Sequence, residues 1–188
     1  MNTRPLICGV RFAGALPVAL LAGPAVRFSV HRRRPPVILV RCLPCDRDYA
    51  DFVLRPEYQL SPGANSGVAL RMPPKAPKQL EVQIADDSAV PPMSAPFEFT
   101  GSLYGVKLEH LAQPNPPGEW NRMEIELKGR SLRVMVNDQE TTQVSLDEPA
   151  VAKFLGGPAP AGGRIGLQGW HGSARFRNIE LQELGPAP

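Results

Sequence analysis

A chain of 188 residues is long enough for one well-buried domain and short for two. Its 22 prolines and 17 glycines, and the lack of sustained helical periodicity after residue 48, favour an all-β fold with many turns. The net charge of +3 does not indicate a nucleic-acid-binding protein, because much of the positive charge precedes the patterned region, at Arg4, Arg11, Arg27, Arg32, Arg33, Arg34 and Arg41.

Residues 1–47 form a leader that differs from the rest of the chain. No acidic residue precedes Asp46, and no period is visible, whereas residues 48–185 alternate regularly and form the predicted domain. Arg4 precedes an apolar, alanine-rich stretch typical of a secretory signal, but Arg11 interrupts it and no clean cleavage site follows. Two alternatives for localisation stay open: export to the periplasm or extracellular space, and no export. No apolar run reaches the roughly 18 residues of a membrane span.

The first predicted strand is YADFVLRPEYQL, residues 49–60. Aromatic and aliphatic residues alternate there with polar ones, and Pro56 indicates either a bulge or an edge position. Arg55 on the polar side is a weak candidate for binding a sugar oxygen. The following turn, SPGANSG, contains Asn65 beside glycines, where its amide group can reach sugar hydroxyls.

The next strand, LEVQIADD at residues 80–87, separates into two chemically different faces. Leucine, valine and isoleucine point one way, while Glu81 and Gln83 lie about 7 Å apart on the other face. Asp86 and Asp87 follow as the strand ends, and we expect one to turn toward the site and the other to cap a turn, in either order. We predict that this face carries the site, against the alternative of an ordinary solvated face.

The remaining elements continue the β pattern. A long proline-rich loop, AVPPMSAPFEFTGSLYG, is a candidate for covering a binding face and contains Tyr104. Residues 119–129 alternate as a half-buried strand, Asn137 and Asp138 mark a tight hairpin, and the last strands carry a one-residue bulge near Asn178. Strand after strand without a helix predicts a sandwich of two antiparallel sheets or a jelly roll.

The string GLQGWHG supplies a candidate proton shuttle in His171. Its neighbouring glycines allow close approach to a ligand, and an imidazole titrates near pH 6.5, although a surface histidine is the alternative. Gln168 lies on the outward side of the same strand and is a candidate for substrate binding. Trp170 and Tyr104 are candidates for stacking on a sugar ring, with core packing as the alternative.

Several strings together resemble one family, the 3-keto-disaccharide hydrolase domains, which have a concanavalin-like jelly-roll fold. The resemblance covers residues 48–184 and rests on YADFVLRPEYQLSPGANSGVALR, LEVQIADD, TGSLYG, GEWNRMEIELKG, VMVND and GRIGLQGWHGSARFRNIELQEL, in the family's order. The family's first segment is not recognisable in residues 1–47. The predicted sandwich is therefore either incomplete at its N-terminus or begins with a divergent leader, and we expect the leader to be loosely packed.

The resemblance implies a hydrolase or lyase that acts on 3-keto-glycosides. A ketone at C3 acidifies the C2 proton, its loss allows the C1 oxygen to leave, and water then adds. Such a site needs a base, a group that stabilises the enolate, and a proton donor. The candidate catalytic residues are Glu81, His171, Asp86 and Asp87. A divalent metal ion is one candidate for the second role, with Glu81, Gln83, Asp87 and His171 as its candidate ligands; no other cofactor is implied.

Two other functions fit the same fold. One is a non-catalytic carbohydrate-binding or interaction module, since a jelly roll often only binds. The other is a conventional two-carboxylate glycosidase with a strand motif of Glu, Asp and Glu, which is weaker because Gln83 replaces the intervening acid and a shorter acid, Asp86, ends the motif. The expected partner in each catalytic alternative is a sugar or glycoside.

Overall fold

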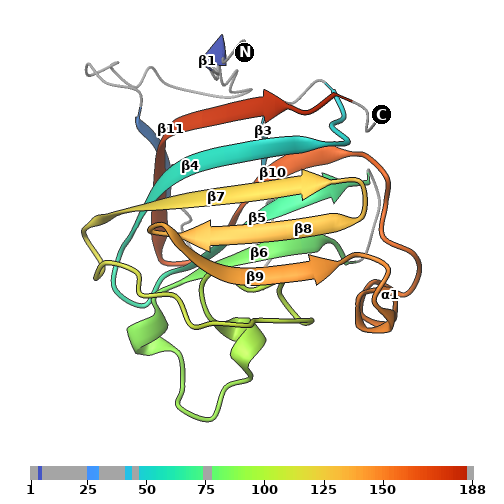
Figure 1. The fold of residues 1–188 in the computed structure, drawn as a ribbon. Helices are drawn as coiled ribbons and strands as arrows, with labels where there is room; N and C mark the ends of the chain where they lie inside the picture. The colour runs from blue at the N-terminus through green and yellow to red at the C-terminus, as the bar shows by residue number, and fades with distance from the viewer. Residues whose placement is uncertain (1–3, 6–24, 30–40, 44–46, 74–77, 186–188) are drawn as a thin grey trace.

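The computed structural model describes residues 4–5, 25–29, 41–43, 47–73 and 78–185. These residues form two antiparallel sheets, as the alternation predicted (Figure 1). The seven-stranded sheet contains β1 (Arg4–Pro5), β2 (Ala25–Ser29), β4 (Phe52–Leu60), β7 (Trp120–Lys128), β8 (Ser131–Val136), β9 (Gln139–Ser145) and β11 (Ser173–Glu183). The four-stranded sheet contains β3 (Arg41–Leu43), β5 (Asn65–Met72), β6 (Leu80–Ala85) and β10 (Arg164–His171).

The core lies between the two sheets. The inward residues of the larger sheet include Phe52, Leu54 and Ile125, and those of the smaller sheet include Val82 and Ile84, all fully buried. The strand order is β1-β11-β4-β7-β8-β9 in the larger sheet, with β2 also on β11, and β3-β10-β5-β6 in the smaller one. Each sheet therefore presents a second, outer face on which polar side chains alternate with core residues.

The β4–β11 pair contains the predicted bulge. Arg177 pairs with Glu57 and Glu180 with Arg55, so two residues of β11 lie opposite Pro56 alone. Asn178 adopts a positive φ of 47° at this point. β4 lies between β11 and β7, so Pro56 marks a bulge inside the sheet, where its missing N–H is tolerated, and not an edge strand.

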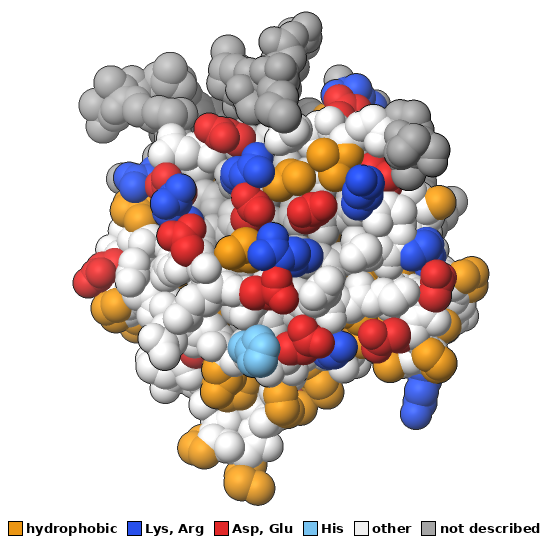
Figure 2. All heavy atoms as spheres, in the orientation of Figure 1, with side chains coloured by type: hydrophobic (Ala, Val, Ile, Leu, Met, Phe, Trp, Pro, Cys, Tyr) orange, Lys and Arg blue, Asp and Glu red, His pale blue; other side chains and the backbone are white. Residues whose placement is uncertain are grey.

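The β8–β9 hairpin turns at Asn137 and Asp138, whose φ values are 47° and 66°. Asparagine and aspartate tolerate this left-handed backbone better than most residues, which confirms the predicted tight turn. Figure 2 shows the outer face of the larger sheet, where acidic and basic side chains alternate over the strands. Here Arg55 pairs with Glu124 and Arg177 pairs with Glu57, each at 2.6 Å.

Three short helices interrupt the described strands: η1 (Asp87–Ala89), η2 (Pro96–Glu98) and α1 (Pro149–Leu155). Helix α1 was not predicted, because seven residues that bury only Val151 give no sustained helical period. Pro149 at its start and Gly156 at its end, with a φ of 74°, are the local signals that delimit it. Within the described part of the chain, no helix is long and apolar enough to cross a membrane.

Three short backbone segments of the leader belong to the sheets. β1 and β2 pair with β11, and β3 pairs with β10 through Ile165, Gly166 and Leu167. The expectation that the leader is loosely packed concerns its side chains and its other residues, which lie outside the described part of the structure.

Candidate functional site

The candidate site is built on the outer face of the four-stranded sheet. Since Leu80, Val82 and Ile84 are in the core, Glu81 and Gln83 face outward, as the alternation predicted. The sheet register sets Gln83 opposite Gly67 of β5, and Gly67 opposite Gln168 of β10. Two glutamines from the neighbouring strands β6 and β10 therefore flank a glycine on β5, and the bare backbone leaves room above it.

Glu81 occupies that room. Its side chain reaches across β5 so that Oε2 accepts a hydrogen bond from Nε2 of Gln168 at 3.0 Å. A Cβ atom on Gly67 would lie 2.4 Å from Oε1 of Glu81, so only glycine allows the carboxylate to lie here. Glu81 is only 7% exposed, so this face is not an ordinary solvated one at this residue.

Burial raises the pKa of the Glu81 carboxyl to about 7, because an ion in a poorly hydrated place loses water that nothing fully replaces. Hydrogen bonds from the side chains of Gln79 and Gln168 act in the opposite direction and lower the pKa. Both partners are neutral amides, so they stabilise the carboxylate without neutralising it. The result is a carboxyl group that gains and loses a proton near neutral pH.

Gln83 is the second buried polar residue of this face, with 2% of its surface exposed. Its Nε2 donates to the carbonyl oxygen of Glu98 at 3.2 Å, which fixes the orientation of the amide. Its Oε1 has no hydrogen-bond partner among the described residues. A buried acceptor without a partner costs about 1–3 kcal/mol, and because this oxygen is itself buried, a ligand reaches it only when neighbouring side chains move.

Residues 101–104, the end of the proline-rich loop, lie along the edge of β6 that does not pair with β5. The N–H of Tyr104 donates to the carbonyl oxygen of Glu81 at 2.9 Å, and the N–H of Gln83 donates to that of Ser102 at 3.0 Å. The Tyr104 ring packs edge-to-face between Phe97 and Phe154 and stays 37% exposed. The loop thus holds Tyr104 at the rim of the site, where an exposed aromatic edge is available to a ligand.

The end of β10 adds the candidate histidine. His171 pairs with Asn65, two residues along β5 from Gly67, and a register irregularity at Trp170 separates His171 from Gln168. Asn65 and His171 are therefore about 7 Å further along the same sheet face than Gly67 and Gln168. His171 is exposed and Trp170 is 42% exposed, so both are accessible to a ligand.

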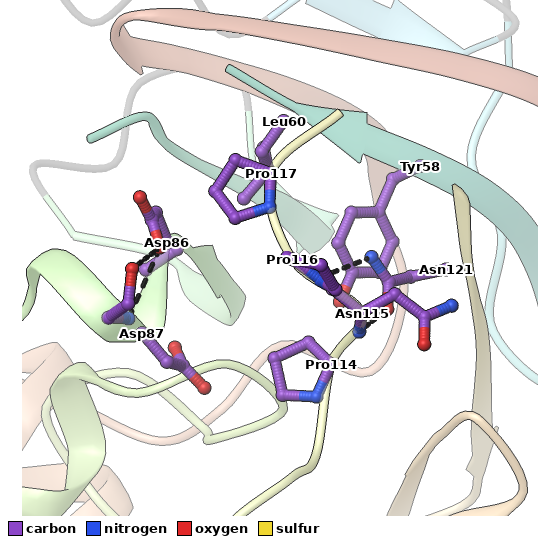
Figure 3. A pocket seen from close by; sticks show the side chains of 11 residues that line it. Tyr58, Leu60, Asp86, Asp87, Pro114, Asn115, Pro116, Pro117 and Asn121 are labelled. Carbon is purple, nitrogen blue, oxygen red and sulfur yellow. Dashed lines mark hydrogen bonds between the residues drawn. The ribbon is translucent and has the colours of Figure 1, made fainter. Parts of the chain in front are cut away.

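Asp86 and Asp87 are not part of this arrangement. Asp86 is a structural cap. Its Oδ2 accepts a hydrogen bond from the N–H of Gly63 at 2.8 Å, and its Oδ1 accepts hydrogen bonds from the backbone N–H and the hydroxyl of Ser88. Asp87 lines a separate cavity beside Tyr58 and residues 114–117 (Figure 3). The four expected metal ligands are therefore not brought together, and no group of three His, Cys, Asp or Glu side chains suited to an ion occurs among the described residues.

Arg55 lies on the outer face of the other sheet. It pairs with Glu124 at 2.6 Å and donates from Nη1 to Gln182 at 3.5 Å. The alternation correctly gave Arg55 an outward direction, but it did not reveal to which sheet β4 belongs. The structure therefore does not bring Arg55 together with Glu81.

Two residues of the site were missed in the sequence. Gly67 has a signal, since an isolated glycine inside a strand often marks a close approach of another group. Gln79 lies just before β6, and nothing in the sequence indicates that its side chain bonds Glu81. The burial of Glu81 was also missed, because a strand pattern does not show what covers its outer face.

Comparisons with known proteins agree with this fold. Residues 42–182 match the model of the 3-keto-alpha-glucoside-1,2-lyase-like domain, and the chain belongs to that family. No curated protein sequence gives a significant match.

Solved structures with the same fold include two proteins from Parabacteroides distasonis, each provisionally named a glycosyl hydrolase. One is 27% identical with a TM-score of 0.63, over 73% of this chain and 80% of that chain. The other is 21% identical with a TM-score of 0.65, over 74% and 73%. A carbohydrate-binding module from Bacillus subtilis is 12% identical with a TM-score of 0.52, over 73% and 78%. The family, with these neighbours, supports a carbohydrate-related function and confirms the predicted jelly-roll class.

Proposed function

We propose that this chain cleaves the C1–O bond of 3-keto-glycosides and that Glu81 is the base that removes the C2 proton. One observation carries the proposal: Glu81, on the outer face of the four-stranded sheet, is a buried carboxyl group with a pKa of about 7. The description of the family to which the chain belongs names a 3-keto-glucoside lyase. A general base works best when its pKa lies near the working pH. An ordinary exposed glutamate with a pKa near 4.5 is a much weaker base.

The proposed reaction begins when the Glu81 carboxylate takes the C2 proton. The electron pair of the C–H bond then forms the enolate of the C3 ketone. When the ketone forms again, a C1–C2 double bond appears and the C1–O bond breaks, and the departing oxygen takes a proton. The lyase reaction stops there, whereas addition of water across C1 and C2 completes a hydrolysis.

The other residues have roles that follow from their positions. Gln168 orients the Glu81 carboxylate through the 3.0 Å hydrogen bond. Gln83 offers its unpartnered Oε1 to a sugar hydroxyl. We assign proton donation to the leaving oxygen to His171, since it is exposed at the end of β10 and an imidazole ring can both donate and accept a proton. Trp170, Tyr104 and Asn65 at the rim are proposed to bind the sugar ring and its hydroxyls.

The carboxyl count of the three strands favours this chemistry over a two-carboxylate glycosidase. Among the residues of β5, β6 and β10, Glu81 is the only Asp or Glu. Retaining and inverting glycosidases need two carboxyl groups that flank the bond. An elimination beside a ketone needs only one carboxylate base. The ketone acidifies the C2 proton and stabilises the anion that forms when this proton is removed.

The test is turnover of a 3-keto-glucoside and of the same glucoside without the ketone. The wild-type chain is expected to cleave only the 3-keto compound, and Glu81→Gln and His171→Ala are each expected to lower its turnover at least about a hundredfold. Glu124→Gln is the matched control, since Glu124 is an outward carboxylate on the other sheet. Cleavage of the unoxidised glucoside would indicate a conventional glycosidase, and binding without any cleavage would indicate a carbohydrate-binding module.

A further inference from the structure

A cavity lies at the end of the sandwich where the chain leaves β6. It holds about 260 Å³. β4 contributes Tyr58 and Leu60 to its wall, residues 85–88 contribute another side, and the segment 114–117 crosses between them. In Figure 3, Asp86 and Asp87 stand on one side of the cavity and Tyr58 and Asn121 on the other. Because Tyr58 and Leu60 point into the space between the sheets, the cavity is separate from the outer face that carries Glu81.

The size of the cavity restricts what it holds. A water molecule occupies about 30 Å³ of liquid, and pockets for drug-sized molecules begin at about 300 Å³. A volume of 260 Å³ lies just below that limit, so it is too large for one water and suits a single small ring. Three prolines, Pro114, Pro116 and Pro117, give part of the wall an apolar surface on which the C–H groups of such a ring can pack.

Tyr58, in the wall of this cavity, carries a buried hydroxyl group. Tyr58 is fully buried, and its hydroxyl has no hydrogen-bond partner among the described residues. Nearly all buried polar groups in proteins are hydrogen-bonded, so an orphan of this kind calls for an explanation. The oxygen itself has almost no exposed surface, so a bound molecule accepts the phenolic proton only when the cavity wall beside Tyr58 shifts.

Asp87 supplies the complementary group. Its Oδ1 accepts the N–H of Thr100 at 2.9 Å, and none of the eleven residues that line the cavity is basic. Burial raises the pKa of the Asp87 carboxyl, and the pKa of Tyr58 is raised by burial and by the negative charge of Asp87. The two groups therefore act on each other electrostatically, yet they form no hydrogen bond.

We infer that this cavity is a second binding site, which takes a neutral ring-sized polyol such as a monosaccharide or a cyclitol. A hydroxyl group both accepts and donates hydrogen bonds, so it can receive the proton of Tyr58 and give its own to Asp87. An anion is repelled by Asp87 and finds no cation in the wall. An ammonium group satisfies Asp87 but cannot accept the Tyr58 proton.

The experiment titrates glucose and myo-inositol into the uniformly ¹⁵N-labelled full chain and follows the amide signals of Leu60, Ala85 and Asp87. At least one of the two polyols is expected to cause saturable shifts of these signals. Tyr58→Phe and Asp87→Asn are each expected to weaken that binding at least tenfold. Glu81→Gln serves as the control, because it changes the outer face only and should leave this affinity as in the wild type.

Thermal melting without ligand separates a binding role of Tyr58 from a structural one. Tyr58→Phe removes only the hydroxyl, so it should leave the melting temperature unchanged or raise it, because no hydrogen bond is lost. A lower melting temperature would show that the hydroxyl already has a partner such as a fixed water, and would overturn the inference. So would shifts that do not saturate, equal affinity in Tyr58→Phe, or binding of methylammonium in place of both polyols. None of these results depends on whether the outer face cleaves 3-keto-glycosides.

Discussion

The outer faces of the two sheets treat charge in opposite ways. On the seven-stranded sheet, acidic and basic side chains lie interspersed on the surface (Figure 2). Arg55 pairs with Glu124, Arg177 with Glu57 and Arg133 with Glu140, all at least partly exposed. On the four-stranded sheet, Glu81 is buried, and its hydrogen-bond partners are the neutral side chains of Gln79 and Gln168. A neutralised, solvated charge is typical of a surface, whereas a buried carboxylate with only amides beside it is typical of a working site.

The energies separate the two faces clearly. An exposed ion pair stabilises a protein by about 0–1 kcal/mol. Raising the pKa of Glu81 from 4.5 to about 7 costs the folded state about 3 kcal/mol at high pH, at about 1.4 kcal/mol for each pKa unit. The outer face of the smaller sheet therefore carries a destabilising buried carboxyl group, and the reaction proposed for Glu81 supplies a physical reason to retain it.

The largest expected effect is the pH dependence of stability caused by Glu81. Below pH 4.5 both the folded and the unfolded chain keep its proton, so the group has no effect. Between pH 4.5 and 7 the unfolded chain loses the proton while the folded chain keeps it, so stability falls as pH rises and levels off above 7. Glu81→Gln removes this loss. The quantity of interest is the free energy of unfolding of the variant minus that of the wild type. This difference should be about 3 kcal/mol larger at pH 8 than at pH 4.

Urea unfolding of both proteins across this pH range measures the difference, in which the other titrating groups cancel. Glu124→Gln on the larger sheet is the control and should show no comparable rise between pH 4 and 8. A difference between Glu81→Gln and wild type that stays constant with pH would contradict the raised pKa.

The second prediction uses Gly67, over which the Glu81 carboxylate lies. In Gly67→Ala the new Cβ falls 2.4 Å from Oε1 and 3.0 Å from Cγ of Glu81, so the side chain must move off Gln168. Because a flexible side chain can move at small cost, the fold should persist. Turnover of a 3-keto-glucoside should fall at least about tenfold, since the base is displaced.

Gly157→Ala is the matched control, because nothing lies within 4 Å of that position and its φ is not positive. It should keep wild-type turnover. If Gly67→Ala also kept full turnover while folded, the position of the Glu81 carboxylate would not matter to the reaction.

The smallest expected effect comes from the paired face. Arg55→Ala breaks the ion pair with Glu124 and should lower the free energy of unfolding by no more than about 1 kcal/mol. Turnover and KM should stay at wild-type values, because Arg55 lies on the other sheet. A raised KM in a stable Arg55→Ala variant would show that the substrate reaches the larger sheet and would remove the distinction between the faces.

Local sequence patterns were enough to predict much of the fold. Alternation placed Met123, Ile125 and Leu127 in the core, and the residue types at the turn predicted the Asn137–Asp138 hairpin. The bulge at Asn178 followed from the spacing of its apolar neighbours. These features depend on a few adjacent residues, so a single sequence contains the information that determines them.

The site was predicted only in part. Strand parity brought Glu81 and Gln83 to one face, and the string GLQGWHG supplied Gln168 and His171 as candidates. Parity does not reveal which sheet a strand joins, so Arg55 was grouped with residues of the other sheet. The pKa of Glu81 depends on its burial and on the hydrogen bond from Gln168, a residue distant in sequence. A strand pattern contains neither piece of information.

The most direct test of the account is the titration of the Glu81 carboxyl group itself. The side-chain carboxyl carbon of each glutamate is followed by ¹³C NMR from pH 4 to 9, and the Glu81 signal is assigned by its loss in Glu81→Gln. The account predicts a midpoint near 7, at the same pH where kcat/KM for a 3-keto-glucoside rises as the base loses its proton. A midpoint near the ordinary 4.5 would contradict it, because Glu81 would then be one more solvated carboxylate like those of the larger sheet.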